Sequence, residues 1–225
     1  MLRKIVDTIR YVPEALNERR YGVKTYGNIP PEELGFPPAG RDYVGGLYRA
    51  SSWPVLRHVF KELRISQQDV FVDYGSGMGR VLILAARQPF KRVLGVEMSE
   101  ELNEVARENI DRHRDRLRCD DVEIVNADAR EWEVPDDLTI AYFYCPFPPR
   151  IFEGVVRQLL ASVDRRPRRL RVVYYLMTAE DRELLLATGR AKQLEYREPW
   201  RLRKRLGELW MFELLPRTAS QSQTS

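Results

Sequence analysis

The stretch from Val70 to Val81 restricts the fold of this chain more than any other part of it. It reads Val-Phe-Val-Asp-Tyr-Gly-Ser-Gly-Met-Gly-Arg-Val, an apolar run that ends in Asp73 and continues into glycines at alternate positions. Glycine permits a tight turn and lets a ligand approach the backbone closely. Helix-like sequence follows, and a helix that begins at such a turn presents free N–H groups beside the ligand. The stretch therefore predicts a strand, a ligand-binding turn and a helix.

Two other nucleotide-binding loops differ from this one in their spacing. A phosphate-binding P-loop needs GxxxxGK[ST], which is absent. The dinucleotide fingerprint is GxGxxG, whereas Gly75, Gly77 and Gly79 give GxGxG. An acid at position 73 would repel a pyrophosphate, but it can pair with the ammonium group of an amino-acid ligand. A turn that needs glycine for geometry alone is the structural alternative, and the acid and the second apolar run both weigh against it.

Further polar positions follow the next two apolar runs. Glu97 ends the second run, where a carboxylate can accept hydrogen bonds from both hydroxyls of a ribose, and Met98 beside it can lie flat against a purine. Asp128 follows the third run and can accept from an adenine amine while the N–H of Ala129 meets a ring nitrogen. Each position has an ordinary alternative, since an acid after a strand is often solvated or part of a turn. The acids in series favour a nucleoside-bearing ligand.

These motifs resemble the S-adenosylmethionine (SAM) site of class I SAM-dependent methyltransferases, over about residues 65–214. The resemblance implies that Asp73 and the glycine loop hold the methionine part of SAM, Glu97 the ribose, and Asp128 with Ala129 the adenine. S-adenosylhomocysteine (SAH) is the implied product. The chain also looks similar to bacterial stand-alone methyltransferases of unassigned substrate, and more distantly to non-SET lysine methyltransferases, which have a comparable Val-Phe-Val-Asp-x-Gly-Ser-Gly opening. The predicted cofactor-binding residues are Asp73, Gly75, Ser76, Gly77, Gly79, Glu97, Met98, Asp128 and Ala129.

Short apolar runs alternate with helical segments through most of the chain. Such alternation is typical of a parallel sheet with helices on both faces. The last two runs have no helix between them and predict an antiparallel hairpin joined by the basic loop 199–205. We therefore predict an α/β fold with a seven-stranded, mostly parallel Rossmann-like sheet and a C-terminal antiparallel hairpin. The expected strands are 70–72, 92–96, 122–125, 138–144, 170–177, 192–198 and 208–214, and the expected helices 52–64, 80–87, 99–113, 150–162 and 179–188.

Residues 1–68 are predicted to form a helical and Gly/Pro-rich cap on this domain. Apolar residues from Leu2 to Val12 have helical spacing, and residues 22–46 read as an extended loop that covers part of the molecule. The methyltransferase-like domain spans residues 69–215. The polar tail, residues 216–225, is expected to be disordered.

The segment after the fourth expected strand is the candidate substrate side. Many amino-directed members of the resembled class carry Asn/Asp-Pro-Pro-Tyr/Phe there, which holds the nitrogen to be methylated. This chain has Tyr144, Cys145, Pro146 and Phe147. Cys145 departs from the pattern because a thiol is a poor acceptor, although Tyr144 and Phe147 can still wall an aromatic cage for a cation. A proline-rich turn is the structural alternative. Trp53 is a candidate lid over the cofactor, with core packing as its alternative.

The sequence identifies no catalytic residue. Methyl transfer is an in-line displacement at the sulfonium methyl, so the protein mainly supplies positioning and a dry site. A general base is needed only where the nucleophile arrives protonated. His58 and His113 are the only histidines. We expect His58 to be partly exposed beside the core and His113 to be solvated at an Arg-rich helix end.

Composition places only weak limits on partners. The chain has 37 Lys and Arg against 33 Asp and Glu, a formal net charge of +4, which mildly favours phosphates or acidic substrates. No apolar run approaches the roughly 20 residues of a membrane helix, and charges break the N-terminus before a signal-peptide core forms. We therefore expect a cytoplasmic protein with no membrane partner. Cys119 and Cys145 lack zinc-site spacing, so reduced thiols and no metal site are expected.

The leading hypothesis is an enzyme that transfers the SAM methyl group to a nitrogen or oxygen of a small molecule, peptide or protein. An RNA methyltransferase is the first alternative, supported by Arg-rich runs at 112–118, 165–171 and 201–205, although charge runs are usually solvated faces. A SAM-binding scaffold without transfer activity is the second, because Cys145 stands where Asn or Asp is expected. The glycine spacing disfavours a dehydrogenase.

Overall fold

The computed structural model describes residues 14–27, 29, 34, 48–144, 147–195 and 208–217. Several predictions lie outside these residues: the helix before residue 13, most of the 22–46 loop, Cys145 with Pro146, the basic loop 199–205 and the tail beyond residue 217. No helix within the described ranges is long and apolar enough to cross a membrane.

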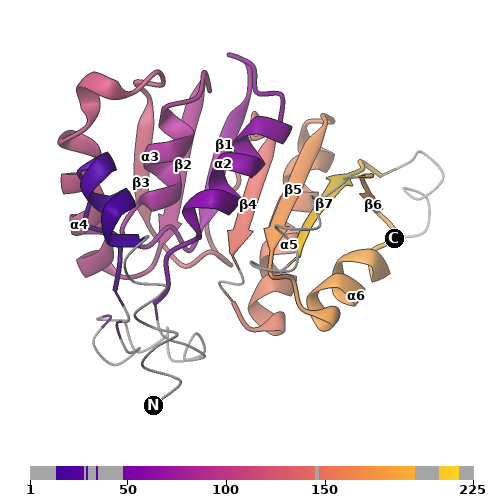
Figure 1. Ribbon diagram of the computed structural model, residues 1–225. Helices are drawn as coiled ribbons and strands as arrows, with labels where there is room; N and C mark the ends of the chain where they lie inside the picture. Colours follow the sequence, from indigo (N-terminus) through magenta and orange to yellow (C-terminus); the bar gives the residue numbers. More distant parts are fainter. Residues whose placement is uncertain are drawn as a thin grey trace.

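A seven-stranded sheet with the order β3-β2-β1-β4-β5-β7-β6 forms the centre of the molecule (Figure 1). Strands β3 to β5 in that order are parallel, and β7 pairs antiparallel with both β5 and β6. This arrangement confirms the predicted α/β fold and its C-terminal antiparallel pair. The strands are β1 (Val70–Tyr74), β2 (Arg92–Glu97), β3 (Val122–Asn126), β4 (Ile140–Tyr144), β5 (Leu170–Tyr175), β6 (Ala191–Gln193) and β7 (Leu209–Leu214).

Helices cover both faces of the sheet, and the central strands are therefore buried on both sides. Phe71 of β1 packs in one core cluster with α2 and α3, whereas its neighbours Val70 and Val72 pack in a second cluster with α5. Side chains alternate across a strand, so a strand covered on both faces is apolar along most of its length, and Asp73 is the exception in β1. The helices are α2 (Trp53–Glu62), α3 (Arg80–Ala86), α4 (Glu100–Asp111), α5 (Pro149–Arg165) and α6 (Ala179–Ala187), with a 3-10 helix, η3 (Arg114–Arg116).

Several elements differ from the sequence-based expectations, among them the unpredicted η3. β6 ends at Gln193, short of the expected residue 198, and residues 196–207 lie outside the described part. A helix over residues 14–21 is not among the predicted elements, because its sequence lacks an apolar stripe and its Leu16 is 63% exposed. Contacts distant in sequence hold it instead, including the ring of Tyr21 stacked on Trp53 at 4.5 Å.

The expectation that His113 is solvated is wrong. Its side chain is only 2% exposed, and its Nδ1 lies 2.7 Å from the carbonyl oxygen of Asn109. The amide of Asn109 in turn bonds both the N–H and the carbonyl of Lys24, each at 3.0 Å. The end of α4 is therefore covered by the N-terminal segment. This contact could not be predicted from the sequence, because the neighbours of His113 are arginines, which usually lie at the surface.

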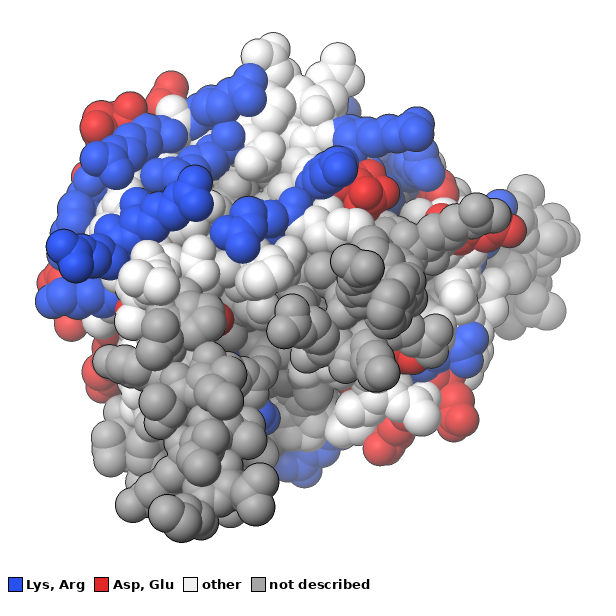
Figure 2. Space-filling model, in the orientation of Figure 1, with Lys and Arg blue, Asp and Glu red and all other residues white. Residues whose placement is uncertain are grey.

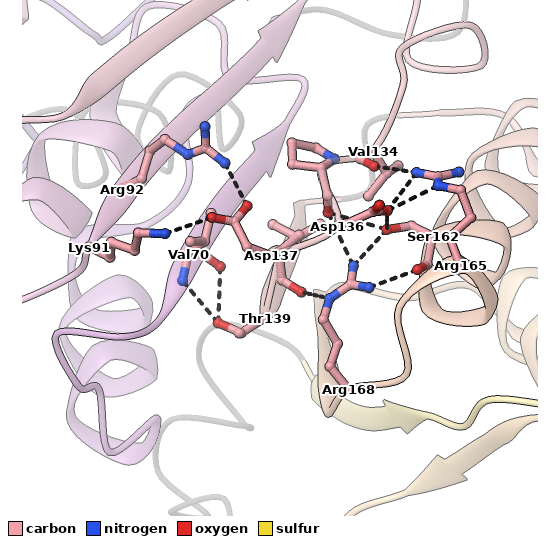
Figure 3. A network of polar contacts seen from close by, with 12 residues as sticks. Val70, Lys91, Arg92, Val134, Asp136, Asp137, Thr139, Ser162, Arg165 and Arg168 are labelled. Atoms are coloured by element: carbon pink, nitrogen blue, oxygen red, sulfur yellow. Dashed lines mark hydrogen bonds and ion pairs between the residues drawn. The ribbon is translucent and has the colours of Figure 1, made fainter.

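A polar network closes the amino edge of the sheet (Figure 3). Asp137 accepts from Lys91 at 2.9 Å and from Arg92 at 2.6 Å. The guanidinium of Arg168 donates to several backbone carbonyls of the neighbouring loops and to the Ser162 hydroxyl. Arg168 lies in the Arg-rich run 165–171, so part of that run fastens loops of this chain to one another.

Candidate functional site

The polar motif residues meet at the carboxyl ends of the central strands. The sheet order reverses between β1 and β4, and open α/β sheets bind ligands in the crevice at such a switch point. Asp73, near the end of β1, is in register with Gly95 of β2 and with Tyr142 of β4. Glu97 is the last residue of the neighbouring strand, β2. The fold thus brings the first two predicted acids and the glycine loop to one edge.

The glycine loop makes a tight turn from β1 into α3. Gly75, Gly77 and Gly79 have φ values of 73°, 51° and 80°, a region that L side chains rarely adopt. The N–H groups of Gly75 and Ser76 donate to the carbonyl of Val96 at 2.8 and 3.3 Å, which fixes the loop against β2. Gly79 is the N-cap of α3 and no side chain caps that helix. The first N–H groups of α3 therefore have no side-chain acceptor from their own cap.

Backbone donors hold the carboxylate of Glu97 between β2 and the loop. Its Oε1 accepts from the N–H groups of Met98 and Ser99 at 2.8 and 3.0 Å, and its Oε2 accepts from the N–H of Gly77 at 3.1 Å. Glu97 is 8% exposed. Burial raises its pKa, while the three N–H donors act in the opposite direction. The result is a fixed acceptor at the point where a ribose is predicted.

Asp73 is buried more deeply, at 2% exposure. Burial raises its pKa well above the ordinary range, and the charge of Glu97 raises it further. No basic side chain of the described residues forms an ion pair with it. A buried carboxyl group without a counter-charge is costly, and acids perturbed in this way cluster at functional sites. A cationic group of a ligand would supply the missing charge.

The third predicted position is engaged in an internal ion pair. Asp128 binds Arg130 through a short contact to Nη2 at 2.6 Å, and it also accepts from the backbone N–H of Arg130 at 2.8 Å. An adenine amine would compete with Arg130 for this carboxylate, so the adenine roles of Asp128 and Ala129 stay predictions. The carbonyl of Met98 accepts from the side-chain amide of Asn126 at 3.0 Å, which fixes the turn after β2.

The ring of Tyr48 packs directly on the glycine loop. A Cβ placed on Gly77 would lie 2.4 Å from a ring carbon of Tyr48, so only glycine leaves room for this contact. The Tyr48 hydroxyl donates to the carbonyl of Thr25 at 3.0 Å. Burial raises the pKa of this hydroxyl, so it stays protonated at neutral pH. The N-terminal segment thereby contacts the glycine loop through Tyr48.

Arg80, the first residue of α3, ties the same segment to the loop. It is 2% exposed, and its guanidinium donates to Glu14 at 2.6 Å, to Thr25 Oγ1 at 2.8 Å and to the Ser51 carbonyl at 3.0 Å. Sequence reasoning missed this residue. A signal was present, because the helix dipole disfavours a cation at a helix N-terminus. An arginine directly after the glycine loop therefore implies an acidic partner elsewhere in the chain.

Trp53 is fully buried beneath these contacts. Its ring lies 4.7 Å from the guanidinium carbon of Arg80 and stacks on Tyr21. Core packing accounts for this position, and a role of Trp53 toward the cofactor stays a prediction.

Aromatic residues line the ends of β4 and β5, on the predicted substrate side. Tyr144 stacks on Tyr175 with ring centroids 5.0 Å apart, and Phe147 is partly buried against the core. The next residue after β5, Leu176, has φ 58° and is 38% exposed. A non-glycine residue in this conformation stores strain of a kind that clusters at ligand sites. We call Tyr144 and Tyr175 the aromatic wall.

Two cavities lie at the opposite edge of the sheet. One of about 630 Å³ is lined by residues that include Asp69, Thr139 and Arg171. The other, of about 710 Å³, is lined by Lys91 and Asp137 among others. Asp69 pairs there with Arg171, and Asp137 pairs with Lys91 and Arg92, as Figure 3 shows for Asp137. Within the described residues, Asp73 and Glu97 at the carboxyl edge form no ion pair, so the chemistry of these acids places the candidate site at the carboxyl edge despite the size of the two cavities.

The fold is similar to that of SAM-dependent methyltransferases of known structure. An RNA methyltransferase from Salinibacter ruber in complex with SAH aligns over 75% of this chain and 95% of its own, with a TM-score of 0.54 and 19% identity. A SAM-dependent O-methyltransferase from Thermotoga maritima aligns over 76% of this chain and 68% of its own, with a TM-score of 0.54 and 17% identity. These similarities confirm the predicted fold and the resemblance to that class.

Sequence comparison also finds similarity to histone methyltransferases. The family model of the histone methylation protein DOT1 matches residues 43–128. A histone-lysine N-methyltransferase, H3 lysine-79 specific, from Drosophila melanogaster is 31% identical over 55 residues, which make up 24% of this chain and 3% of the relative. The matched family region contains Tyr48, the glycine loop, Glu97 and Asp128 and ends before β4. It therefore covers the predicted cofactor side and leaves out the aromatic wall.

Proposed function

We propose that this chain binds SAM at the carboxyl edge of β1 and β2 and transfers its methyl group to an acceptor. The observation that carries the proposal is the pair of buried acids, Asp73 and Glu97, on neighbouring strands around the glycine loop. Burial raises the pKa of both carboxyl groups. The ammonium group of SAM supplies the counter-charge that Asp73 lacks, and the ribose hydroxyls are donors suited to Glu97.

The acceptor is proposed to be a nitrogen or oxygen of a small molecule, peptide or protein. In the transfer, the bond from the sulfonium sulfur to its methyl group breaks as the bond from the acceptor atom to that methyl forms, and SAH is released. The chain's own contribution is to position the two groups and to exclude water. The aromatic wall beside this edge suits a cationic or planar acceptor group.

Calorimetric titration with SAH tests the cofactor assignment, with NAD titrated in parallel. Saturable SAH binding is expected, and Glu97→Ala should weaken it tenfold or more, which corresponds to about 1.4 kcal/mol. Glu104→Ala is the matched control, because Glu104 is an exposed acid on α4. Binding of NAD without binding of SAH would contradict the proposal and make residues 73–79 a divergent dinucleotide loop.

Labelled SAM then tests methyl transfer itself. Label that passes to small-molecule, peptide or protein fractions of a cell extract would support the leading proposal. Label that passes to RNA would favour the RNA methyltransferase alternative, for which run 165–171 counts less than expected because Arg168 and Arg171 are engaged internally. SAH binding without any transfer would leave the non-catalytic scaffold.

A further inference from the structure

A broad basic surface covers the helical layer formed by residues 14–21, α2 and the end of α3. Figure 2 shows it as a band of Lys and Arg side chains with few acids among them. All but one of its members are exposed, and the remaining one, Arg87, is partly exposed. We call this set the basic face; it consists of Arg19, Arg20, Arg57, Lys61, Arg87 and Arg118.

Tertiary contacts bring these residues together from separate parts of the chain. Tyr21 stacks on Trp53 of α2. The guanidinium carbon of Arg87 lies 4.9 Å from the centroid of the Tyr21 ring. The N–H of Arg118 donates to the carbonyl of Ala86 at 2.7 Å, which places the loop after η3 beside the end of α3. No Arg-rich run in the sequence marks this surface as a whole, because only Arg118 belongs to one.

The charges of the basic face have no acidic partners within the described residues. None of its members forms an ion pair there, whereas Arg112, Arg114 and Arg116 of the neighbouring run each lie within 4.0 Å of a carboxylate. Arg57 donates only to the neutral side-chain oxygen of Asn17, at 3.4 Å. Like charges gathered without counter-charges create a positive potential that attracts an anionic partner.

We propose that the basic face binds the phosphate backbone of a nucleic acid. Five of its six members are arginines, whose planar guanidinium matches phosphate oxygens in a bidentate geometry.

A protein interface needs an apolar, aromatic-rich centre, and an interfacial membrane site needs inserted aromatic or leucine side chains. Among the described residues, the exposed large apolar side chains are Leu16, Leu176 and Leu215. Only Leu16 lies on this layer, so the face fits a regularly spaced polyanion better than either of those partners.

This inference goes beyond the proposed methyl transfer and does not depend on it. The basic face belongs to the α2 and α3 layer, whereas the candidate cofactor site lies at the carboxyl edge of the sheet. Nucleic-acid binding here is therefore expected with and without SAH, and it leaves open which molecule receives the methyl group.

Fluorescence anisotropy with a labelled RNA hairpin and a labelled DNA duplex of mixed sequence tests the proposal. The logarithm of the binding constant should fall linearly with the logarithm of salt concentration, by roughly 0.7 to 0.9 for each phosphate contact. Arg19→Gln/Lys61→Gln/Arg118→Gln should reduce the steepness of that slope by roughly 2 to 2.7 and weaken binding at low salt roughly tenfold or more. The two probes distinguish RNA from DNA as the preferred source of phosphate.

A second triple variant, Arg150→Gln/Arg157→Gln/Lys192→Gln, removes the same charge elsewhere. Arg150 and Arg157 lie on α5, on the opposite face of the sheet, and Lys192 lies on β6. It should bind both probes as the unaltered protein does. Equal losses in both triple variants would show that net charge alone attracts the probes and would overturn the proposal, as would binding of neither probe by the unaltered protein. Thermal unfolding and SAH titration of each variant separate this outcome from misfolding and from failure of the cofactor site.

Discussion

At the scale of single residues, Gly77 contributes space to the candidate site. Its φ is 51°, and Tyr48 occupies the volume that a Cβ would need. Gly189 also has positive φ, 65°, but nothing lies within 4 Å of a Cβ placed there. The two glycines therefore share the backbone constraint and differ only in their surroundings.

Gly77→Ala should be the more damaging of the two alanine substitutions. Both variants acquire backbone strain of about 1 kcal/mol, and Gly77→Ala must in addition displace the Tyr48 ring. We expect a larger loss of unfolding free energy for Gly77→Ala, measured by urea denaturation, and weaker SAH binding in that variant only. Equal losses in both variants would mean that Tyr48 is not held against the loop.

Asp73 leads to a prediction about pH. A carboxyl group with a raised pKa in the folded state binds its proton more tightly there than in the unfolded chain. The native state is then favoured by protonation, so stability falls as pH rises from the unfolded pKa, about 4, toward the folded value. Asp73→Asn should flatten this dependence in denaturation midpoints taken across that window. The exposed Asp120→Asn should leave it unchanged, and an unaltered slope in Asp73→Asn would exclude Asp73 as its origin.

At the scale of elements, the helix of residues 14–21 depends on Arg80. Arg80 pairs with Glu14 at 2.6 Å and lies 3.5 Å from Glu18, two acids of that helix. Removing one partner of a buried pair leaves the other charge uncompensated. Arg80→Met should therefore cost on the order of 3 kcal/mol of unfolding free energy and make residues 14–27 sensitive to protease.

Arg107→Met is the matched control for Arg80→Met. Arg107 pairs with Glu100 on the exposed side of α4, and surface pairs of this kind contribute little. Its denaturation curve and protease pattern should resemble those of the unaltered protein. Protection of residues 14–27 in Arg80→Met would show that packing around Trp53 and Tyr21 suffices to hold the helix.

Elements buried by the sheet could be predicted from sequence, whereas elements held by contacts distant in sequence could not. β1, covered on both faces, is apolar from Val70 to Val72, and its pattern is therefore visible in the sequence. The helix of residues 14–21 and the burial of His113 both depend on segments distant in the chain. The same division holds at the site: Glu97 follows a strand and was expected, but the contacts of Tyr48 and Arg80 arise where the N-terminal segment crosses the loop.

At the scale of the whole molecule, the two edges of the sheet differ in how their charges are compensated. At the amino edge, Asp69 pairs with Arg171, and Asp137 pairs with both Lys91 and Arg92. Hydrogen bonds from Ser66 and Thr139, with the charge of Arg171, lower the pKa of Asp69 despite partial burial. The Lys91 hydrogen bond and the charges of Arg92 and Lys91 do the same for the pKa of Asp137. At the carboxyl edge, burial raises the pKa of Asp73 and Glu97. The folded protein thus stabilises ionised acids at one edge and disfavours them at the edge proposed to bind a cationic ligand.

This difference predicts that SAH binding releases a proton. The ligand's ammonium group favours ionised Asp73, so below the raised pKa of Asp73 the carboxyl group must lose its proton as the complex forms. Affinity should rise with pH through the window between the unfolded and the folded pKa of Asp73, and the heat of binding inside that window should differ between buffers of unlike ionisation enthalpy. Asp73→Asn should bind SAH more weakly and give the same heat in every buffer. Buffer-independent heat in the unaltered protein would mean that Asp73 is already ionised before SAH binds. The glycine loop and Glu97 would then hold the site in its binding geometry, and no proton of Asp73 would be involved.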